Sequence, residues 1–179
     1  MRYIALLRGI NVGGNNKVSM TDLKQCFEQL GFEHVSSYIN SGNILFDADE
    51  KDIHALIVRC EKAIEMKFGF HVTCSVMAAD DVKAALDHAP QWWGRNDTDK
   101  HNALFVIPPA TPASVMEEVG KEKPEYEKIA SYGSVIFWTA PLKTFGRTRY
   151  SKIVGTKAYQ SITIRNANTM RKLVELARG

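Results

Sequence analysis

The sequence has few cysteines and no long hydrophobic run. Its 179 residues include 3 Cys, and no apolar run exceeds the five residues of Ala103–Ile107. A membrane-spanning helix needs about 20 apolar residues, so we expect none and predict no membrane partner. The cysteines are far apart and form no CxxC pair. That spacing argues against a disulfide framework or a zinc site and predicts a cytoplasmic protein.

The motifs of well-known enzyme classes are also missing. None of the five histidines has HExxH spacing, and no GxSxG motif occurs. The carboxylates of residues 47–52 are interpreted as the start of a helix, where acidic side chains favour the N-terminal dipole. We therefore predict no metal site and no cofactor, and the sequence leaves open whether the protein is an enzyme.

The composition is that of a folded protein. Hydrophobic residues make up 45% and charged residues 24% of the chain, which excludes intrinsic disorder and a fibrous repeat. The length allows one large domain or two domains of about 90 residues.

The order of predicted elements favours two domains. Residues 2–8 read as a strand, residues 20–30 as a helix, and residues 34–40 and 43–48 as a hairpin. Residues 53–68 then form a helix with one apolar stripe, and residues 72–77 a strand. Ser19 with Asp22 resembles a capping box, and Gly31 is suited to the end of the first helix. This β-α-β-β-α-β order defines the ferredoxin-like unit.

The second half repeats this order. Residues 101–107 and the hairpin of residues 126–139 read as strands, with a helix between them that starts at Thr111 and Pro112 and ends at Gly120. Helical residues near 151–158, a strand at 161–165 and a last helix follow. We predict an α+β protein of two ferredoxin-like halves, with antiparallel sheets and helices on one face. The predicted domains are residues 1–90 and 101–179, the second with an extra C-terminal helix, and residues 91–100 are the linker.

Three motifs carry a resemblance to a known family. They are LLRGINVGG from Leu6, YINSGNILF from Tyr38 and TIRNANT from Thr163. Across nearly the whole chain the sequence resembles the bacterial domain-of-unknown-function family 1697. The resemblance implies two ferredoxin-like halves and no established activity. Relatives usually have tryptophan between the two asparagines of the third motif, where this chain has Ala167, so any stacking by that ring is lost here.

The first candidate site is the glycine-rich loop, residues 8–18, between the first strand and first helix. Backbone N–H groups of Asn11 to Asn15 could hold an anion beside the helix N-terminus. The spacing fits neither the P-loop nor the dinucleotide fingerprint. The alternative is a long connection whose glycines supply positive φ. The candidate residues are Arg8, Gly9, Asn11, Gly13, Gly14 and Lys17.

The second candidate is the junction of the first hairpin. It contains Asn40, Ser41, Gly42 and Asn43. A plain hairpin turn is the favoured interpretation, because Asn, Ser and Gly all suit tight turns. In the functional interpretation the polar side chains of Asn40, Ser41 and Asn43 lie beside the glycine-rich loop.

The third candidate is a basic C-terminal segment. Residues 1–89 carry 9 basic and 12 acidic side chains, whereas residues from Lys143 onward carry 9 basic ones and only Glu175 as an acid. Phe145, Tyr150 and Tyr159 lie among them, a pattern that favours binding phosphates and stacking bases. A solvated basic surface is the alternative. The candidate ligand residues are Arg147, Arg149, Ser151, Lys152, Arg165, Asn166 and Asn168, although both asparagines also suit the cap of the last helix.

The open sheet faces are poor candidates for RNA recognition. That mode needs exposed aromatic residues, whereas residues 3–7 and 103–107 are apolar on both faces and are expected to be covered on both. The resulting hypothesis is a protein that binds a nucleic acid or a phosphorylated small molecule through the basic segment and the glycine-rich loop. The alternatives are a small enzyme with a cleft between its domains and a protein-interaction module.

Overall fold

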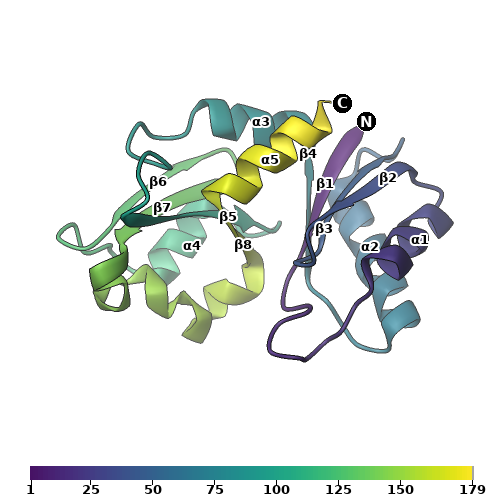
Figure 1. The fold of residues 1–179 in the computed structure, drawn as a ribbon, viewed down its shortest axis with the longest axis horizontal. Helices are drawn as coiled ribbons and strands as arrows, with labels where there is room; N and C mark the ends of the chain where they lie inside the picture. Colours follow the sequence, from purple (N-terminus) through teal and green to yellow (C-terminus); the bar gives the residue numbers. More distant parts are fainter. Residues whose placement is uncertain (179) are drawn as a thin grey trace. The chain divides into compact units, whose positions relative to one another are not determined.

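The computed structural model describes residues 1–178 and divides into two compact units. The first unit is Met1–Asp81 with the chain from Leu173 on, and the second is Val82–Lys172. Each unit contains one four-stranded antiparallel sheet (Figure 1). The second unit therefore contains residues 91–100, the predicted linker. The reason is local, because Trp93 is buried against Phe137 and its indole N–H donates to the Asn102 carbonyl oxygen at 2.9 Å.

The first unit has the predicted element order. Its elements are β1 (Arg2–Leu7), α1 (Met20–Gln29), β2 (Glu33–Tyr38), β3 (Asn43–Asp47), α2 (Ile53–Phe68) and β4 (Cys74–Ala78), and its strand order is β2-β3-β1-β4. Ser19 caps α1 by accepting from the Asp22 backbone N–H, and Gly31 follows the helix at φ +81°. Both helices lie on one side of the sheet (Figure 1).

The second unit repeats that strand order. After α3 (Ala79–Asp87), which begins at the end of the first unit, come β5 (Asp99–Val106), α4 (Pro112–Val119), β6 (Lys128–Tyr132), β7 (Val135–Pro141), β8 (Ile162–Asn166) and α5 (Ala167–Ala177). Its sheet order is β6-β7-β5-β8. Thr111 and Ser114 form a capping box at α4, with Pro112 at its first position. The prediction of an α+β protein with two similar halves is confirmed.

The connection between β7 and β8 differs in kind from its counterpart in the first unit. Three short 3₁₀ helices, η1 (Leu142–Arg147), η2 (Tyr150–Gly155) and η3 (Lys157–Ser161), occupy the place of α2. They pack with α4 over the face of the sheet that presents Leu104, Ile136 and Trp138. These short helices carry the basic segment, so their packing decides which of its residues face solvent.

Strands β1 and β5 are buried on both faces, as their sequences indicate. Residues 3–7 and 103–106 are each at most 1% exposed. In the first unit the aromatic rings of Tyr3, Phe27 and Phe32 gather around Phe46. No helix among residues 1–178 combines the length and apolar character needed to span a membrane.

Candidate anion-binding site

The glycine-rich loop is a small hairpin closed by its own backbone. Gly13 and Gly14 have φ of +58° and +80°, and the Asn15 N–H donates to the Val12 carbonyl oxygen at 3.1 Å. The Asn11 N–H donates to the Asn16 carbonyl oxygen at 3.1 Å. The backbone N–H groups of Asn11 and Asn15 are thus already bonded within the loop. The expectation that these two N–H groups hold an anion is therefore corrected.

The side chain of Asn11 joins the loop to the first hairpin. Its Nδ2 donates to the carbonyl oxygens of Val18 and Asn40, each at 2.9 Å, and its Oδ1 accepts from the Val18 N–H at 2.8 Å. The Leu7 N–H donates to the Gly42 carbonyl oxygen at 2.8 Å. The first two candidate motifs therefore lie side by side. Hydrogen bonds between them occupy the side-chain amide of Asn11 and the carbonyl oxygens of Asn40 and Gly42.

The remaining residues of the hairpin junction and the loop have mostly local roles. Asn43 is fully buried, and its Nδ2 donates to the Tyr38 carbonyl oxygen and the Ser41 hydroxyl. These contacts are those of a turn, the favoured interpretation. Arg8 is half-buried, and its Nη2 donates to Thr73 Oγ1 at 2.9 Å. Gly9 at φ +72° and Lys17 are exposed.

The basic segment is anchored by a buried carboxylate. Glu127 is 3% exposed, and its two oxygens accept from the backbone N–H groups of Lys123, Arg149 and Tyr150 at 2.7–3.2 Å. Ser151 is used in the same turn, because its hydroxyl donates to the Thr148 carbonyl oxygen at 3.1 Å.

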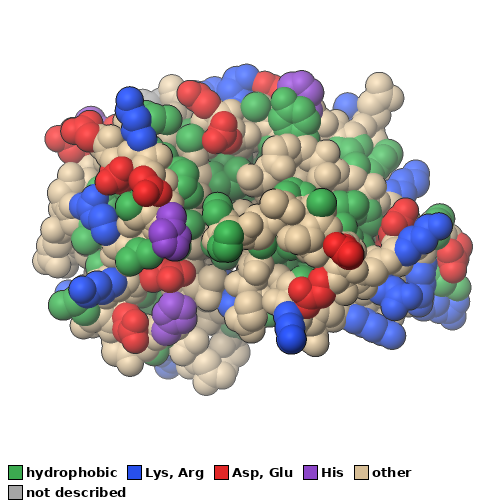
Figure 2. Space-filling view, turned by 180° about the vertical axis from the view of Figure 1, so that it is seen from behind, with side chains coloured by type: hydrophobic (Ala, Val, Ile, Leu, Met, Phe, Trp, Pro, Cys, Tyr) green, Lys and Arg blue, Asp and Glu red, His purple; other side chains and the backbone are tan. Residues whose placement is uncertain are grey.

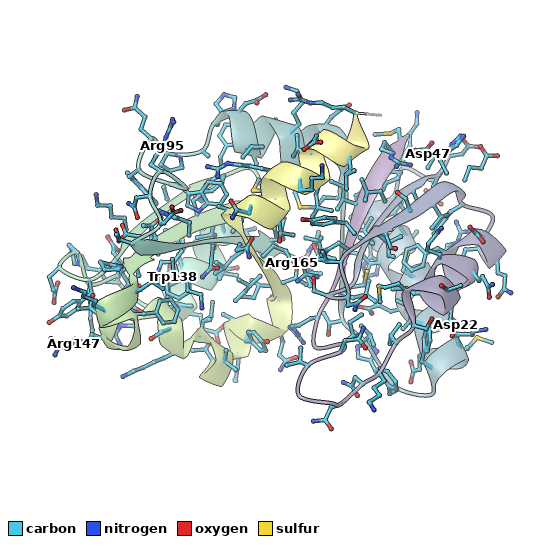
Figure 3. All side chains as sticks on the ribbon, viewed as in Figure 1. Asp22, Asp47, Arg95, Trp138, Arg147 and Arg165 are labelled. Carbon is cyan, nitrogen blue, oxygen red and sulfur yellow. The ribbon has the colours of Figure 1, made fainter. Side chains whose placement is uncertain are left out.

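Three basic side chains of this segment face outward. Arg147, Arg149 and Lys152 are exposed. Figure 2 shows Lys and Arg side chains gathered at the end of the second unit where Figure 3 labels Arg147.

The aromatic residues of the basic segment do not form a stacking surface. Tyr150 is 1% exposed and packs beside Trp138. Burial, with Glu122 and Glu127 nearby, raises the pKa of Tyr150 to about 12. Phe145 and Tyr159 are half-buried, and the Phe145 ring lies against Trp138 at 5.0 Å. The expectation of base stacking is therefore corrected for Tyr150, whose ring belongs to the core.

A polar cleft in the second unit contains the third sequence motif. Its volume is about 470 Å³, and it lies where α5 begins. Asn166 caps α5 through its Oδ1, which accepts from the Thr169 N–H at 2.8 Å, and Ala167 and Asn168 also line the cleft. The N-terminal end of a helix is electropositive and favours anions. The other lining residues are Gly94, Arg95, Asn96, Asp97, Asp99, Lys100, His101, Leu142 and Arg171.

Arg171 is held in a fixed position in this cleft. Its guanidinium carbon lies 5.7 Å from the Trp93 ring centroid, and its Nη2 donates to the Gly94 carbonyl oxygen at 2.8 Å. Gly94 makes this possible, because a Cβ there would lie 2.2 Å from Nη2. A guanidinium has five N–H donors, and one has a protein acceptor among residues 1–178. No carboxylate of those residues lies within 4.0 Å of it.

Two further cations and two acids share the cleft. Lys100 Nζ lies 4.4 Å from the Phe145 ring centroid, and Arg95 Nε donates to the Gln91 carbonyl oxygen at 3.0 Å. Asp99 accepts from the side chains of Asn96 and Thr98, while Asp97 is exposed. The formal net charge of the lining side chains is +1, from three cations and two acids. The N-terminal end of α5 adds further positive potential. Among residues 1–178 no group of His, Cys, Asp and Glu could hold a metal ion.

The part of the cleft formed by β5 contains the half-exposed end of the strand and one buried histidine, His101. His101 is 8% exposed, with Nε2 3.0 Å from the Asn96 carbonyl oxygen and Nδ1 2.7 Å from Thr139 Oγ1. A carbonyl oxygen only accepts, so Nε2 carries a proton. The ring of His101 is thus held on both of its nitrogen atoms.

Two of the residues predicted from the sequence, Asn166 and Asn168, line this cleft. The predicted residues Arg147, Arg149, Ser151 and Lys152 do not line it. Arg165 is half-buried on β8 and its Nη1 donates to the Ile164 carbonyl oxygen. Figure 3 shows Arg95 and Arg147 on opposite sides of the sheet of the second unit.

Arg95 and Lys100 were missed because they fall at the predicted linker. Two signals could have pointed to them. The tryptophan pair indicated a packed segment, and Gly94 follows that pair directly.

Comparisons with known proteins agree with this fold. A conserved bacterial protein from Streptococcus pneumoniae has a solved structure that is 34% identical, covers 98% of both chains and superposes with a TM-score of 0.86. A crystal structure of an unknown protein from Galdieria sulphuraria is 10% identical, with 93% of this chain and 97% of that chain covered. Its TM-score of 0.22 is too low to indicate a shared fold. No curated protein matches the sequence. Residues 1–137 match the family model described as protein of unknown function DUF1697, so the chain belongs to that family.

Proposed function

We propose that the protein binds a phosphate-bearing small molecule in the cleft at the start of α5. The observation that supports this most is the guanidinium of Arg171, which is fixed by Gly94 and Trp93 yet has no carboxylate partner within 4.0 Å among residues 1–178. A planar guanidinium matches the geometry of a phosphate and donates to it in a bidentate manner.

The surroundings of Arg171 support the same ligand class. Arg95 and Lys100 line the cleft with it, and the N-terminal end of α5 adds positive potential. The cleft volume of about 470 Å³ is within the usual range for small-molecule sites. Because the guanidinium is already positioned, binding requires little ordering of that side chain, which favours affinity.

The test is thermal unfolding of the protein with and without inorganic phosphate. Phosphate should raise the melting temperature of the parent, since a ligand that binds only the folded state stabilises it. Arg171→Gln should remove most of that increase while remaining folded. The matched control is Arg147→Gln, which removes an equal charge outside the cleft and should retain the phosphate response.

Two results would contradict this proposal. One is a parent protein whose melting temperature does not respond to phosphate at any concentration that leaves control proteins unaffected. The other is an equal loss of response in both variants, because that would indicate general charge screening.

A second candidate function rests on the exposed basic side chains of η1 and η2. Lys143, Arg147, Arg149 and Lys152 are exposed and have no carboxylate within 4.0 Å among residues 1–178. Such a surface can bind the phosphates of a single-stranded nucleic acid without stacking its bases. The logarithm of its affinity should then fall with the logarithm of salt concentration, by about 0.7 per phosphate neutralised.

Replacement of Arg147, Arg149 and Lys152 by Gln tests this second candidate. The triple variant should flatten the salt dependence of single-stranded DNA binding, whereas Arg171→Gln should not. Absence of binding to any nucleic acid at about 50 mM salt, where such contacts are strong, would exclude it.

A further inference from the structure

A second cleft shares two cations with the proposed phosphate site. It has a volume of about 370 Å³ and is lined by Arg95 and Arg171, which also line the first cleft. Both clefts belong to the second unit. The side chain of Arg171 thus borders both clefts.

The second cleft has a larger share of apolar residues in its lining than the first. Apart from Arg95 and Arg171, four of its five lining residues are apolar, namely Leu86, Ala89, Pro90 and Trp93. Trp93 is 2% exposed and already packs against Phe137, so it contributes a firm wall rather than a free ring. The acid in this cleft, Asp87, is bonded to Lys83 on the same helix.

We propose that the ligand is a phosphate monoester with a flat ring, such as an aryl or nucleoside phosphate. Its phosphate lies against the Arg171 guanidinium at the start of α5, and its ring occupies the second cleft beside Leu86 and Pro90. The guanidinium matches a dianionic phosphate, and the ring removes the apolar surface of Leu86 and Pro90 from water. This inference rests on the proposed function and adds the chemical class of the ligand to it.

The experiment compares ligands that share a phosphate but differ in the ring. Isothermal titration of the full chain with phenyl phosphate and methyl phosphate isolates the ring, and AMP against ribose 5-phosphate repeats the comparison for nucleosides. Burial of one ring should make the ring-bearing member of each pair bind about tenfold tighter or more.

Variants in the second cleft locate the ring. Ala89→Trp should fill the cleft and reduce phenyl phosphate affinity to that of methyl phosphate, with methyl phosphate unchanged. Leu86→Ser removes an apolar wall without adding bulk. This variant should also reduce the affinity for phenyl phosphate. The matched control is Ala113→Trp, at an exposed position of α4 outside both clefts, and this variant should bind all four ligands as the parent does.

The outcomes separate this inference from the proposed function. If methyl phosphate and inorganic phosphate fail to bind, the phosphate site itself is wrong. If both bind at the Arg171-dependent site but the ring adds no affinity, the phosphate site stands and the ring assignment is overturned. It is also overturned if Ala113→Trp weakens phenyl phosphate as much as Ala89→Trp does.

Discussion

Gly42 is the residue at which the first hairpin and the glycine-rich loop touch. Its φ is +77°, and a Cβ there would lie 2.7 Å from both the Ile10 Cδ1 and the Leu7 Cβ. Ile10 is 2% exposed and Leu7 is in the central strand β1, so neither can move away easily. Gly13, by contrast, has φ +58° with no atom within 4 Å of its Cβ position. Substitution of Gly13 therefore tests backbone strain alone, whereas substitution of Gly42 tests strain together with crowding of the core.

Alanine at these positions should lower the free energy of unfolding by different amounts. Gly13→Ala should cost about 1–2 kcal/mol, because only the left-handed backbone is strained. Gly42→Ala adds a clash with the core, and overpacking costs a further 1–3 kcal/mol or so. Urea denaturation of both variants measures the difference. Equal losses would show that the hairpin and loop are not in the described contact.

At the scale of elements, the 3₁₀ helices η2 and η3 depend on carboxylates far away in sequence. Glu127 accepts from the N–H groups of Arg149 and Tyr150, and Glu118 accepts from the Ala158 N–H at 2.8 Å. A buried carboxylate that is paired with backbone donors is satisfied without a cation. This leaves the basic side chains of η1 and η2 directed outward, and it places Tyr150 inward.

Tyr150 should make the stability of the protein depend on alkaline pH. Its pKa in the folded protein is about 12, against 10.0 for an ordinary tyrosine. Between these values the unfolded chain has lost the proton and the folded chain has kept it. Stability is therefore fully present below pH 10 and declines as the pH rises toward 12, by about 2–3 kcal/mol.

Urea denaturation between pH 9 and 12 measures this decline. Tyr150→Phe has no proton to lose at that position, so its decline should be smaller than that of the parent. The pKa of Tyr3 is also raised by burial, so part of the decline should remain in the variant. Identical slopes for variant and parent would show that the Tyr150 hydroxyl is not buried as described.

Elements with strong local signals could be predicted from sequence. Thr111, Pro112 and Gly120 mark the limits of α4, and Ser19 and Gly31 mark those of α1, because capping depends on a few neighbouring residues. The region of residues 142–161 could not be read in this way. Short 3₁₀ helices leave no lasting hydrophobic period, and contacts with Glu118 and Glu127 decide which side chains are buried.

The candidate site was predictable only where one motif supplied it. Asn166 and Asn168 were identified because they form a local motif at a helix start. The position of the Arg171 guanidinium depends on the turn at Gly94, whose φ of +71° and missing side chain admit it. No pattern along the chain encodes this approach of two residues that are 77 positions apart.

At the scale of the molecule, two units of the same topology carry opposite charge. Residues 1–89 have a formal net charge of −3 and residues 90–179 one of +6, which gives the total of +3. The cleft at the start of α5, whose lining side chains have a formal net charge of +1, belongs to the second unit. In the first unit, the N–H groups of Asn11 and Asn15 in the glycine-rich loop are used in hydrogen bonds within that loop. An anionic ligand is consequently expected in the second unit.

The most direct test of this account is a crystal of the protein soaked in tungstate, a heavy analogue of phosphate. The account predicts anomalous density in the cleft at the start of α5, beside the Arg171 guanidinium. The same soak of Arg171→Gln should show none there. Density confined to the exposed arginines of η1 and η2, or to the glycine-rich loop, would contradict it.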